Sequence, residues 1–520
     1  MNRDSYIATL KRESRVWDII VIGGGATGLG VGVDAASRGF RTLLLEQHDF
    51  SKGTSSRSTK LIHGGVRYLR QGNFALVFES LHERGLLVRN APHLVRNLLF
   101  LVPSYTWWDG PFHGAGMKVY DLLAGKLGLG PSRRISRDEI LKRMPTIEPA
   151  GLQGGVLYHD GQFDDARLAV NLAQTMADLD GAPVNYMKVV GLLKREGRIE
   201  GVSALDLETG ESHQIRGRAV VNAAGVFSDG VRALDDPGAK PVITPSQGVH
   251  LVLPERFLPG GTAVMVPHTE DGRVLFAVPW HGVVLLGTTD TPVAWIGLEP
   301  RPFDAEVEFL LKHAARLLTE HPSRRDVLSV FAGLRPLVAH PGGHGSTAAI
   351  SRDHFVHVSG SGMVTITGGK WTTYRRMAED AVASAIEAAG LERRPCPTRE
   401  LPIHGWMKNL EGKDPLEFYG ADLPRIRSLA LERPCLGEKL HAELPCIGAE
   451  VVWAVRAEMA RTVEDVLARR TRALFVNARA SMEAAPAVAS IMAEELGRDR
   501  DWMGMQVRDY LELAEGYLLA

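Results

Sequence analysis

The chain has 520 residues, with 60 lysines and arginines against 61 aspartates and glutamates. That length predicts two or three structural units. The near-neutral charge excludes a general attraction to nucleic acid or to an anionic membrane, so any anion site must be a local cluster. The three cysteines form no C-x-x-C pair, which disfavours zinc and disulfides and favours a reducing compartment.

The N-terminal segment lacks the apolar core and cleavage site of a secretory signal, and its acidic residues argue against a transit peptide. No window of about eighteen consecutive apolar residues occurs, which argues against a membrane-spanning helix. We therefore expect a cytoplasmic chain, and we predict no metal site.

The first predicted elements are strand, helix and strand: the apolar run WDIIVI is followed by GGGATGLGVGVDAASRG and then by RTLLLE. Gly23, Gly25 and Gly28 form G-x-G-x-x-G where the helix begins. The first glycine permits a tight turn, the second lets a pyrophosphate approach the backbone, and the third lets helix and strand pack closely. Glu46 ends the second strand, where its carboxylate can accept hydrogen bonds from a ribose. Together these features predict a dinucleotide site.

Helical periodicity appears next in DDARLAVNLAQTMADLDG, which begins with paired carboxylates. A helix N-terminus favours acidic residues, so we interpret Asp165, with Arg167, as fixing this helix to its surroundings. The pair Asp164 and Asp165 is therefore not interpreted as an acid/base pair.

Two later segments fit a flavin. RAVVNAAGVFSD is an apolar strand ending at Ala224 and Gly225, and it resembles the second fingerprint of FAD-binding oxidoreductases with two dinucleotide-binding motifs. MVTITGGKWTTYRR predicts a strand, a turn at Gly368 and Gly369, and a helix. The N-terminus of that helix can face the flavin pyrimidine edge, where its dipole favours the charge of a reduced flavin.

From about residue 391, LERRPCPTRELPIHG reads as a linker, and most of the chain beyond it has a helical pattern. In EVVWAVRAEMARTVEDVLARRTRAL, apolar residues at three- and four-residue spacings lie along one face. The pattern predicts a separate C-terminal helical domain; the residues are Val451, Val455, Met459, Val463, Val466 and Leu467.

A series of motifs carries a family resemblance: VIGGGATGLGVGVDAASRG, TSSRSTKLIHGGVRYL, DDARL, PSQGVH, LLGTTD, FAGLRPL and TGGKWTTYR. In this order they resemble the FAD-dependent glycerol-3-phosphate dehydrogenases of the D-amino-acid-oxidase-like flavoprotein superfamily. The resemblance implies oxidation of sn-glycerol 3-phosphate to dihydroxyacetone phosphate, hydride transfer to flavin N5, and electron transfer to a respiratory quinone or, as in oxidase relatives, to oxygen. Relatives also form homodimers. No calcium-loop pattern like that of mitochondrial relatives occurs, which implies a bacterial-type architecture.

The implied fold is α/β: a Rossmann-like, two-dinucleotide-binding-type FAD domain with an α+β substrate-binding cap and an all-helical C-terminal domain. We expect the oxidoreductase domain over 1–390, a linker over 391–415 and the helical domain over 416–520. The FAD-binding part is expected over about 15–100, 155–240 and 325–390, and the cap over about 101–154 and 241–324.

Under this resemblance, different residues of the stretch TSSRSTKLIHGGVRYLR have different expected roles. Its hydroxyls and backbone N–H groups are expected to hold the FAD diphosphate or the flavin edge, and its glycines to let the backbone run close to the ring. The residues are Thr54, Ser55, Ser56, Ser58, Gly64 and Gly65.

Three cations match family positions that bind the substrate phosphate: Arg67, Arg335 in GLRPL and Lys370 in GGKW. A planar guanidinium suits a phosphate dianion. Tyr68 and Tyr374 are weaker candidates. The alternative for each cation is a surface salt bridge.

Oxidising a secondary alcohol requires a base that takes the hydroxyl proton. Histidine suits this role because its ordinary pKa, about 6.5, lies near working pH. His63 and His250 both match positions lining the family's site, and the sequence does not assign the base between them; either can also be a satisfied core histidine. We favour His63, which shares a turn with the expected flavin contacts, and give His250 the role of orienting substrate.

Reaching a quinone requires surface attachment to the inner face of the cell membrane. Residues 105–134 combine Trp107, Trp108 and several cations, as an interfacial segment does, although a cap that buries both tryptophans fits equally. Other hypotheses are a glycerol-3-phosphate oxidase, an oxidase of an amine or hydroxy acid, and a non-catalytic FAD-binding protein. A carboxylate substrate would need only one well-placed arginine, and no basic stripe supports nucleic-acid binding.

Overall fold

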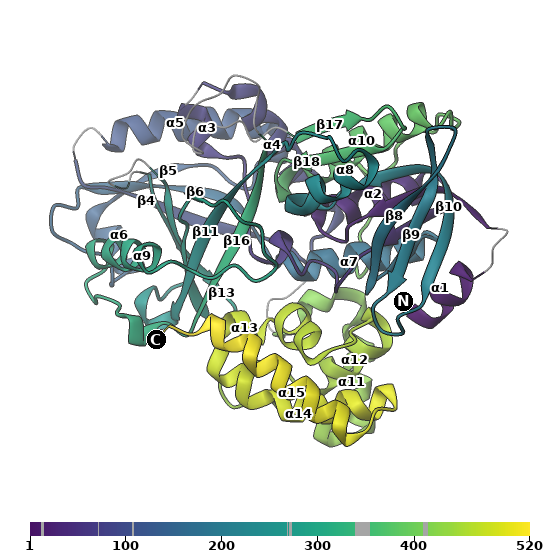
Figure 1. Ribbon diagram of the computed structural model, residues 1–520. Helices are drawn as coiled ribbons and strands as arrows, with labels where there is room; N and C mark the ends of the chain where they lie inside the picture. The colour runs from purple at the N-terminus through teal and green to yellow at the C-terminus, as the bar shows by residue number, and fades with distance from the viewer. Residues whose placement is uncertain are drawn as a thin grey trace.

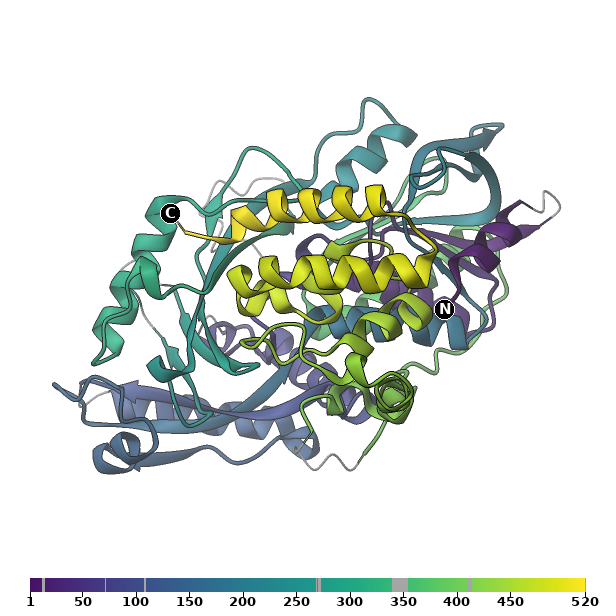
Figure 2. The same ribbon diagram turned by 90° about the horizontal axis from the view of Figure 1, so that it is seen from below.

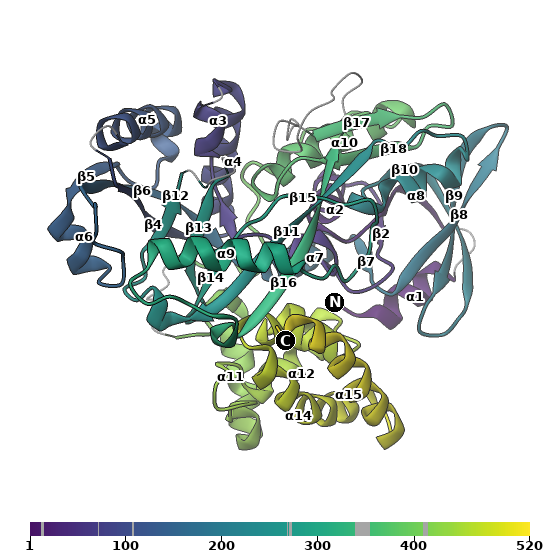
Figure 3. The same ribbon diagram turned by 60° about the vertical axis from the view of Figure 1, so that its left-hand side comes forward.

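The computed structural model describes residues 1–11, 15–70, 72–106, 109–267, 269, 273–338, 354–408 and 414–519. These residues form two sheets flanked by helices and a C-terminal helical region, which lies below both sheets in Figures 1 and 3. The predicted α/β class, with a Rossmann-like part and a helical C-terminal part, is confirmed.

The first sheet carries the dinucleotide motif. β1 pairs in parallel with β2 and β10, and β10 pairs in parallel with β18. Both faces of β1 are covered, one by α2, α7 and α10 and the other by β8, β9 and α1, which explains why residues 19–22, IIVI, are apolar without alternation. The strand order is β17 (His354–Val358), β18 (Val364–Gly368), β10 (Ser212–Asn222), β1 (Val16–Ile22), β2 (Thr42–Leu45) and β7 (Ala182–Val184), with β8 (Met187–Arg195) and β9 (Arg198–Asp206) continuing from β10.

The parallel strands bring distant motifs to one edge. Ile22, the last residue of β1, lies opposite Leu45 of β2 and Asn222 of β10. The residues that come after β1, β2, β10 and β18 therefore emerge together at the carboxyl edge, the usual ligand edge of such sheets. The helices against this sheet are α1 (Arg3–Leu10), α2 (Ala26–Ser37), α7 (Asp165–Asp178), α8 (Ser228–Asp235) and α10 (Tyr374–Ala388).

The second sheet places His250. Along β11, Val249 and Leu251 pack into the core that α9 covers, while Val252 and the neighbouring Phe331 belong to the core shared with the C-terminal helices. Since side chains alternate along a strand, His250 points to the second of these faces. The strand order is β15 (Thr291–Pro292), β11 (Ile243–Pro254), β14 (Val283–Gly287), β13 (Leu275–Trp280), β12 (Ala263–Val266), β4 (Val95–Ser104), β6 (Gly154–Phe163) and β3 (Leu61–Ile62), with β16 (Ser329–Val338) on β11 and β5 (Arg133–Ser136) on β6.

Five helices lie around the second sheet. α4 packs against both α3 and α5 on the side away from the C-terminal helices (Figure 3). Their bounds are α3 (Val66–Arg70), α4 (Phe74–Asn90), α5 (Asp109–Ala124), α6 (Arg137–Arg143) and α9 (Asp304–Leu317).

The C-terminal helices depart from the predicted pattern. The apolar periodicity reads as one helical face, but the chain turns at Met459 and Arg472, whose φ angles are 57° and 62°. Between them lies the π-helical turn Asp465–Arg470. Figure 2, seen from below, shows α14 and α15 lying side by side on the face nearest the viewer. The helices are α11 (Leu423–Glu432), α12 (Gly448–Glu458), α13 (Ala473–Val476), α14 (Ala478–Leu496) and α15 (Arg500–Ala514).

These turns direct arginines into the rest of the protein. Arg470 donates two hydrogen bonds to Asp49, at 2.7 and 2.8 Å, and Arg469 donates to the same carboxylate at 2.5 Å. All three side chains are buried. Burial alone would raise the pKa of Asp49, but the charges of Arg470 and Arg469 outweigh it and hold that pKa below its ordinary value.

The acidic residues at the start of α7 join the same set of contacts. Asp164 caps the helix by accepting from the backbone N–H of Arg167 at 3.0 Å, and the Arg167 guanidinium forms a bidentate pair with Glu458 of α12 at 2.5 and 2.7 Å. Asp165 accepts from Arg472 at 3.1 Å. As predicted, these residues anchor α7. We call Asp49, Asp165, Arg167, Glu458, Arg469, Arg470 and Arg472 the buried ion cluster.

His404, which lies between α10 and α11 in the chain, bridges two acidic residues. Its Nδ1 lies 2.6 Å from Asp178 at the end of α7, and its Nε2 lies 2.8 Å from Asp422 beside α11. Burial alone would lower the pKa of His404, but its hydrogen bonds to these carboxylates and their charges raise it to about 9.

This geometry predicts a pH-dependent contribution to stability. Because the folded-state pKa, about 9, lies above the unfolded value of about 6.5, the stabilisation is complete below about pH 6.5 and is lost as pH rises through 9. We expect His404→Gln to lower the free energy of unfolding by about 1–2 kcal/mol at pH 6, since hydrogen bonds of a charged group are partly screened by solvent. The difference from wild type should shrink by pH 10 in denaturant titrations.

The matched control is His441→Gln, because His441 also faces a carboxylate, that of Glu483 at 3.0 Å, but an exposed one. A destabilisation by His404→Gln that stays constant from pH 6 to pH 10 would contradict the charged bridge.

Candidate active site

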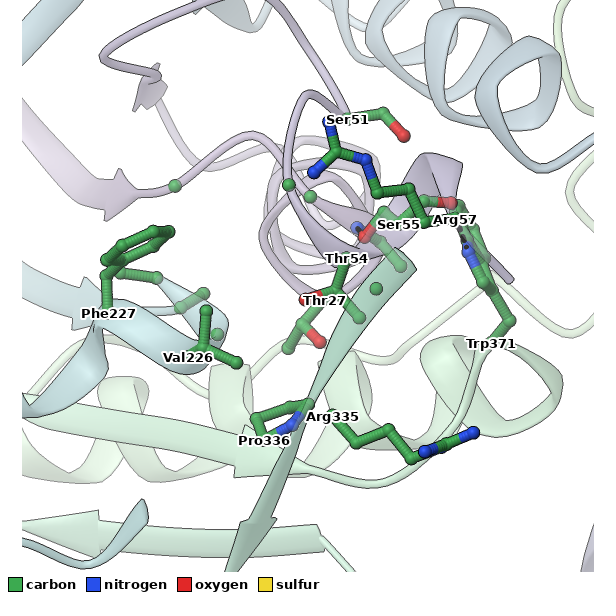
Figure 4. Close-up of a pocket in the computed structure, with 18 of the residues that line it drawn as sticks. Thr27, Ser51, Thr54, Ser55, Arg57, Val226, Phe227, Arg335, Pro336 and Trp371 are labelled. Carbon is green, nitrogen blue, oxygen red and sulfur yellow. Dashed lines mark hydrogen bonds between the residues drawn. The ribbon is translucent and has the colours of Figure 1, made fainter. Parts of the chain in front are cut away.

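One cavity of about 350 Å³ opens at the carboxyl edge of the first sheet. Its walls come from the turns after β1, β2, β10 and β18 and from the segment 51–63, with β11 and β16 of the second sheet on another side. In Figure 4, Val226 and Phe227 stand on the opposite side from Arg57 and Trp371. The predicted residues that line it are Gly23, Gly25, Glu46, Thr54, Ser55, Ser58, His63, Ala224, Gly225, His250, Arg335, Gly368, Gly369 and Lys370.

The glycine turn has the predicted shape. Gly23 has a φ of 110°, which side chains disfavour. A Cβ on Gly28 would lie 1.9 Å from the carbonyl oxygen of Gly23, so only glycine lets α2 start this close to β1. Glu46 accepts hydrogen bonds from the backbone N–H groups of Gly24, at 2.6 Å, and His48, at 2.9 Å. The carboxylate is thereby held at the turn, and burial raises its pKa.

The 54–60 loop crosses in front of that turn. The Ser55 hydroxyl accepts from the N–H of Ala26 at 2.9 Å, and the Ser55 carbonyl accepts from the indole of Trp371 at 2.9 Å. The hydroxyl of Thr54 donates to the carbonyl of Leu334 at 2.7 Å. Figure 4 shows Thr54 and Ser55 gathered at the α2 spiral. The loop thus joins the glycine turn to β16 and to the GGKW motif.

Two residues of the 54–60 loop bind the buried carboxylate of Asp165. This carboxylate accepts from the Ser58 hydroxyl and from the ammonium of Lys60, both at 2.7 Å. Lys60 is fully buried, and desolvation, opposed by the charge of Asp165, lowers its pKa to about 8. Ser56 is buried and is not among the lining residues, but its carbonyl accepts from Lys60 and from Arg472.

Both predicted histidines line the cavity. The backbone N–H of His63 donates to the Thr372 hydroxyl at 3.3 Å. His250 is 2% exposed, and its Nε2 lies 2.9 Å from the hydroxyl of Thr59. Burial, then the charges of Lys60 and Arg335, lowers the pKa of His250 well below its ordinary value, so its imidazole is neutral at pH 7.

Two of the three predicted cations line the same cavity. Arg335 donates to the carbonyl of Thr289 at 2.9 Å and pairs with Asp290 at 3.3 Å. Lys370 donates to the Ser80 hydroxyl at 2.9 Å and lies 4.8 Å from the ring centre of Tyr68. Arg67 belongs to α3, but its side chain lies outside the described residues.

Gly64 and Gly65 lie beside the cavity and are not lining residues. The N–H of Gly64 donates to the hydroxyl of Tyr120 at 2.8 Å, and a Cβ on Gly64 would approach Leu81 to 2.5 Å. Gly65 has a φ of 77°. In the structure these glycines let the turn after His63 pack against α4 and α5.

Several lining residues were not predicted. Arg57 and Thr59 stand inside the serine-rich stretch TSSRSTK, and Trp371 inside GGKW, but nothing in their spacing distinguishes them from their neighbours. Lys52 and Lys188 resemble any other surface lysine in the sequence. Only the folded structure, in which the loop meets the strand edges, identifies these residues as part of the cavity wall.

The residues present fit a flavin dinucleotide. Gly25 is the N-cap of α2 and has no side chain of its own, so the positive end of the helix borders the cavity with the Ser55 hydroxyl, which accepts from the N–H of Ala26, beside it. Gly225, Gly368 and Gly369, which line the cavity where β10 and β18 end, all have positive φ angles, a conformation that glycine adopts without strain. Among the residues that the structure describes, no group of three His, Cys, Asp or Glu side chains could hold a metal ion.

Comparison with known proteins gives two family matches. Residues 18–375 match the model described as FAD dependent oxidoreductase, and residues 363–502 match the C-terminal domain of alpha-glycerophosphate oxidase. The mitochondrial glycerol-3-phosphate dehydrogenase of Mus musculus is 39% identical, over 99% of this chain and 75% of its own. That of Schizosaccharomyces pombe is 37% identical, over 98% of this chain and 89% of its own.

Solved structures agree. The glycerol-3-phosphate dehydrogenase from Bacillus halodurans, complexed with FAD, superposes with a TM-score of 0.80 at 28% identity and covers 99% of this chain and 97% of that chain. The L-alpha-glycerophosphate oxidase from Mycoplasma pneumoniae, with FAD bound, has a TM-score of 0.56 at 16% identity, covers 76% of this chain and 100% of that chain, and shows a similar fold alone.

The glycine turn predicts a sharp difference between two alanine substitutions. In Gly28→Ala the new Cβ would meet the Gly23 carbonyl oxygen at 1.9 Å, and such overpacking costs about 1–3 kcal/mol. We expect about a tenfold or greater loss of FAD affinity, measured as flavin absorbance retained per protein after dialysis.

The control is Gly53→Ala. Gly53 also lines the cavity, but its φ is −78° and a Cβ there would meet nothing within 4 Å. Equal flavin retention by the two variants would show that the α2 turn does not hold the dinucleotide.

Proposed function

This chain belongs to the FAD-dependent oxidoreductases and, among them, to the glycerol-3-phosphate dehydrogenases, and we propose how its residues divide the oxidation of glycerol 3-phosphate between them. The protein is an FAD-dependent enzyme that converts this substrate to dihydroxyacetone phosphate. The observation that carries the assignment of roles is that a dinucleotide turn, both predicted histidines and two of the predicted cations line one cavity.

The glycine turn, the N-terminus of α2 and Glu46 would hold the dinucleotide, with the 54–60 loop and the Gly368–Gly369 turn at its flavin end. When bound, FAD supplies the hydride acceptor at N5. The remaining roles belong to side chains of the protein: to bind the phosphate, to orient the alcohol and to take its proton.

We assign the proton acceptor to His63 and the orientation of the substrate to His250. Support comes from the position of His63 on the cavity wall beside Thr372 of the GGKW motif. His250 is buried and neutral, with its ring fixed by Thr59, which suits a group that directs a hydroxyl by hydrogen bonding. With the alcohol oriented by His250, its hydroxyl proton moves to the imidazole of His63 as hydride leaves the carbon that carries the hydroxyl.

We assign the substrate phosphate to Arg335 and Lys370, with Arg67 as the third cation. Arg335 already has partners, but its contact with Asp290 is long, at 3.3 Å, so a phosphate dianion can compete for the guanidinium. Because Arg335 and Lys370 both line the cavity, they favour a dianionic phosphate over a carboxylate, for which one arginine would suffice.

For the electron acceptor we propose a respiratory quinone, reached by surface attachment to the inner face of the cell membrane. No helix in the described ranges is long and apolar enough to span a bilayer. Trp107 and Trp108 lie outside the described residues. Among the side chains that the structure describes, α4 and α5 expose four that are apolar, which suits a membrane surface: Phe74 (52% exposed), Phe78 (56%), Val119 (39%) and Leu122 (79%). A homodimer stays a prediction.

The substrate assignment predicts selective flavin reduction. Under anaerobic conditions, glycerol 3-phosphate should bleach the flavin absorbance near ~450 nm, while glycerol and lactate should not, because the phosphate provides the charged contacts. Arg335→Gln should weaken glycerol 3-phosphate binding by about 10–100-fold, the loss expected for hydrogen bonds between charged groups.

Arg324→Gln is the control, since Arg324 pairs with Asp304 and Glu308 on the surface. Bleaching by lactate or glycerol, or no bleaching at all, would overturn the substrate assignment. Admitting oxygen or a soluble quinone to the reduced protein then separates an oxidase from a dehydrogenase.

The surface assignment predicts weaker membrane binding without loss of chemistry. Full burial of a large apolar side chain contributes about 1.5–3 kcal/mol, so Phe78→Ser with Leu122→Ser should reduce sedimentation with phosphatidylglycerol vesicles about tenfold or more. Anaerobic flavin reduction should stay at the wild-type rate.

Leu431→Ser is the matched control, because Leu431 is 82% exposed on α11, on the other side of the molecule (Figures 1 and 3). If this variant lost as much vesicle binding as the double variant, the surface formed by α4 and α5 would not be the one that contacts the membrane.

A further inference from the structure

An unbroken series of aromatic rings runs from the cavity into the C-terminal helical region. His250 of β11 stacks on Phe331 of β16, with ring centres 4.9 Å apart and planes 13° apart. Phe331 meets Phe475 of α13 at 4.9 Å, and Phe475 meets Tyr517, just after α15, at 5.5 Å. We call His250, Phe331, Phe475 and Tyr517 the aromatic column.

The four side chains of the column are buried and closely packed. The exposed fractions of its members are 2%, 2%, 1% and 5% in that order. On the far side of His250, a Cβ on Gly287 would come within 2.2 Å of the imidazole, so β14 presses against the ring from there. In an interior of this density, the position of one ring determines that of the next.

Cations hold the column from the side. The ammonium of Lys60 lies 5.0 Å from the ring centre of Phe331 and 5.3 Å from that of Phe475. The guanidinium of Arg472 lies 4.2 Å from Phe475. Both cations pair with Asp165, a member of the buried ion cluster. The same two cations therefore contact both the ion cluster and the aromatic column.

Both ends of the column return to the cavity wall. At one end, His250 lines the cavity and meets Thr59 of the 54–60 loop. At the other end, the Tyr517 hydroxyl accepts a hydrogen bond at 3.0 Å from Arg57, another lining residue of the same loop. The column therefore meets the 54–60 loop at both of its ends, and its C-terminal members, Phe475 and Tyr517, are not among the lining residues.

We propose that Phe475, a residue of the C-terminal helical region, is a positioning residue for the oxidation: through Phe331 it holds the imidazole of His250 in the orientation that the substrate hydroxyl requires. The inference rests on the proposed function of His250 and extends it to a residue that contacts neither substrate nor flavin.

The physical reason is that the Phe331 ring, which stacks on His250, is also in contact with Phe475, whose ring plane is 60° from its own. Replacing Phe475 with a smaller, flexible side chain removes this second contact, which lets Phe331 tilt and admits water toward His250. A misplacement of about 1 Å at a reacting group can cost about a hundredfold in rate. Lys60 and Arg335 are the charged groups that face His250, and the replacement leaves their carboxylate partners, Asp165 and Asp290, unchanged.

The experiment compares Phe475→Leu with wild type as FAD-loaded full-length protein, by anaerobic stopped-flow reduction with glycerol 3-phosphate. We expect a limiting rate constant about 10–100-fold lower, with the substrate Kd changed less than about threefold. Because water would then reach His250, the pKa of its imidazole should rise, so the rate at pH 6 relative to pH 8 should fall further than in wild type.

Phe418→Leu is the matched control, because Phe418 belongs to the same helical region and faces a different histidine. The ring centres of Phe418 and His281 are 6.1 Å apart. Phe331→Leu provides the second test. If Phe475 acts through Phe331, adding Phe475→Leu to that variant should lower the rate no further. Phe475→Met is measured in place of Phe475→Leu should the latter lose its flavin.

The outcomes separate the two proposals. If glycerol 3-phosphate fails to reduce the wild-type flavin, the proposed function is wrong. If wild type is reduced and Phe475→Leu matches Phe418→Leu in rate and in pH profile, only the positioning role is overturned. A slowed rate that is additive with that of Phe331→Leu, or that comes with an unchanged pH profile, also overturns it.

Discussion

The structure depends on the pairing of buried charges between the C-terminal helices and the rest of the protein. Asp49 lies in the turn after β2 and Asp165 at the start of α7, and both are fully buried. A buried carboxylate is costly unless it is paired, and removing one partner of a buried pair typically costs about 3–5 kcal/mol. The partners are Arg469, Arg470 and Arg472 of one short C-terminal segment. The C-terminal helices are therefore required to complete the flavin-binding half.

The same pairing supports the chemistry. Asp165 is shared between Arg472 on the C-terminal side and the 54–60 loop, whose Ser58 and Lys60 it binds. That loop forms one wall of the cavity, so the interface that stabilises the fold also fixes the wall of the site. A site built on such supports is organised before substrate arrives, which is what oxidation of an alcohol by hydride transfer requires. The aromatic column extends this support to His250.

Local patterns predicted the parts whose chemistry lies within a few residues. The glycine spacing requires a tight turn at Gly23 and a close helix at Gly28, and the structure shows both. The helical periodicity of the C-terminal part correctly predicted helices, but it did not predict that the chain turns at Met459 and Arg472. Periodicity records which side of a helix is apolar, but it carries no information on where the chain must turn so that arginines reach carboxylates some four hundred residues away in the sequence.

The sequence by itself determined the family, the dinucleotide turn and the kinds of residue at the site, because those depend on short motifs with a fixed local geometry. Only the tertiary structure decided which residues meet. The parallel register of β1, β2, β10 and β18 brings Glu46, Gly225 and Gly368 to one edge, and the packing of α13 on β16 brings Phe475 against Phe331, the ring that stacks on His250. Such contacts are set by the close packing of elements distant in the chain, and no spacing along the sequence encodes them.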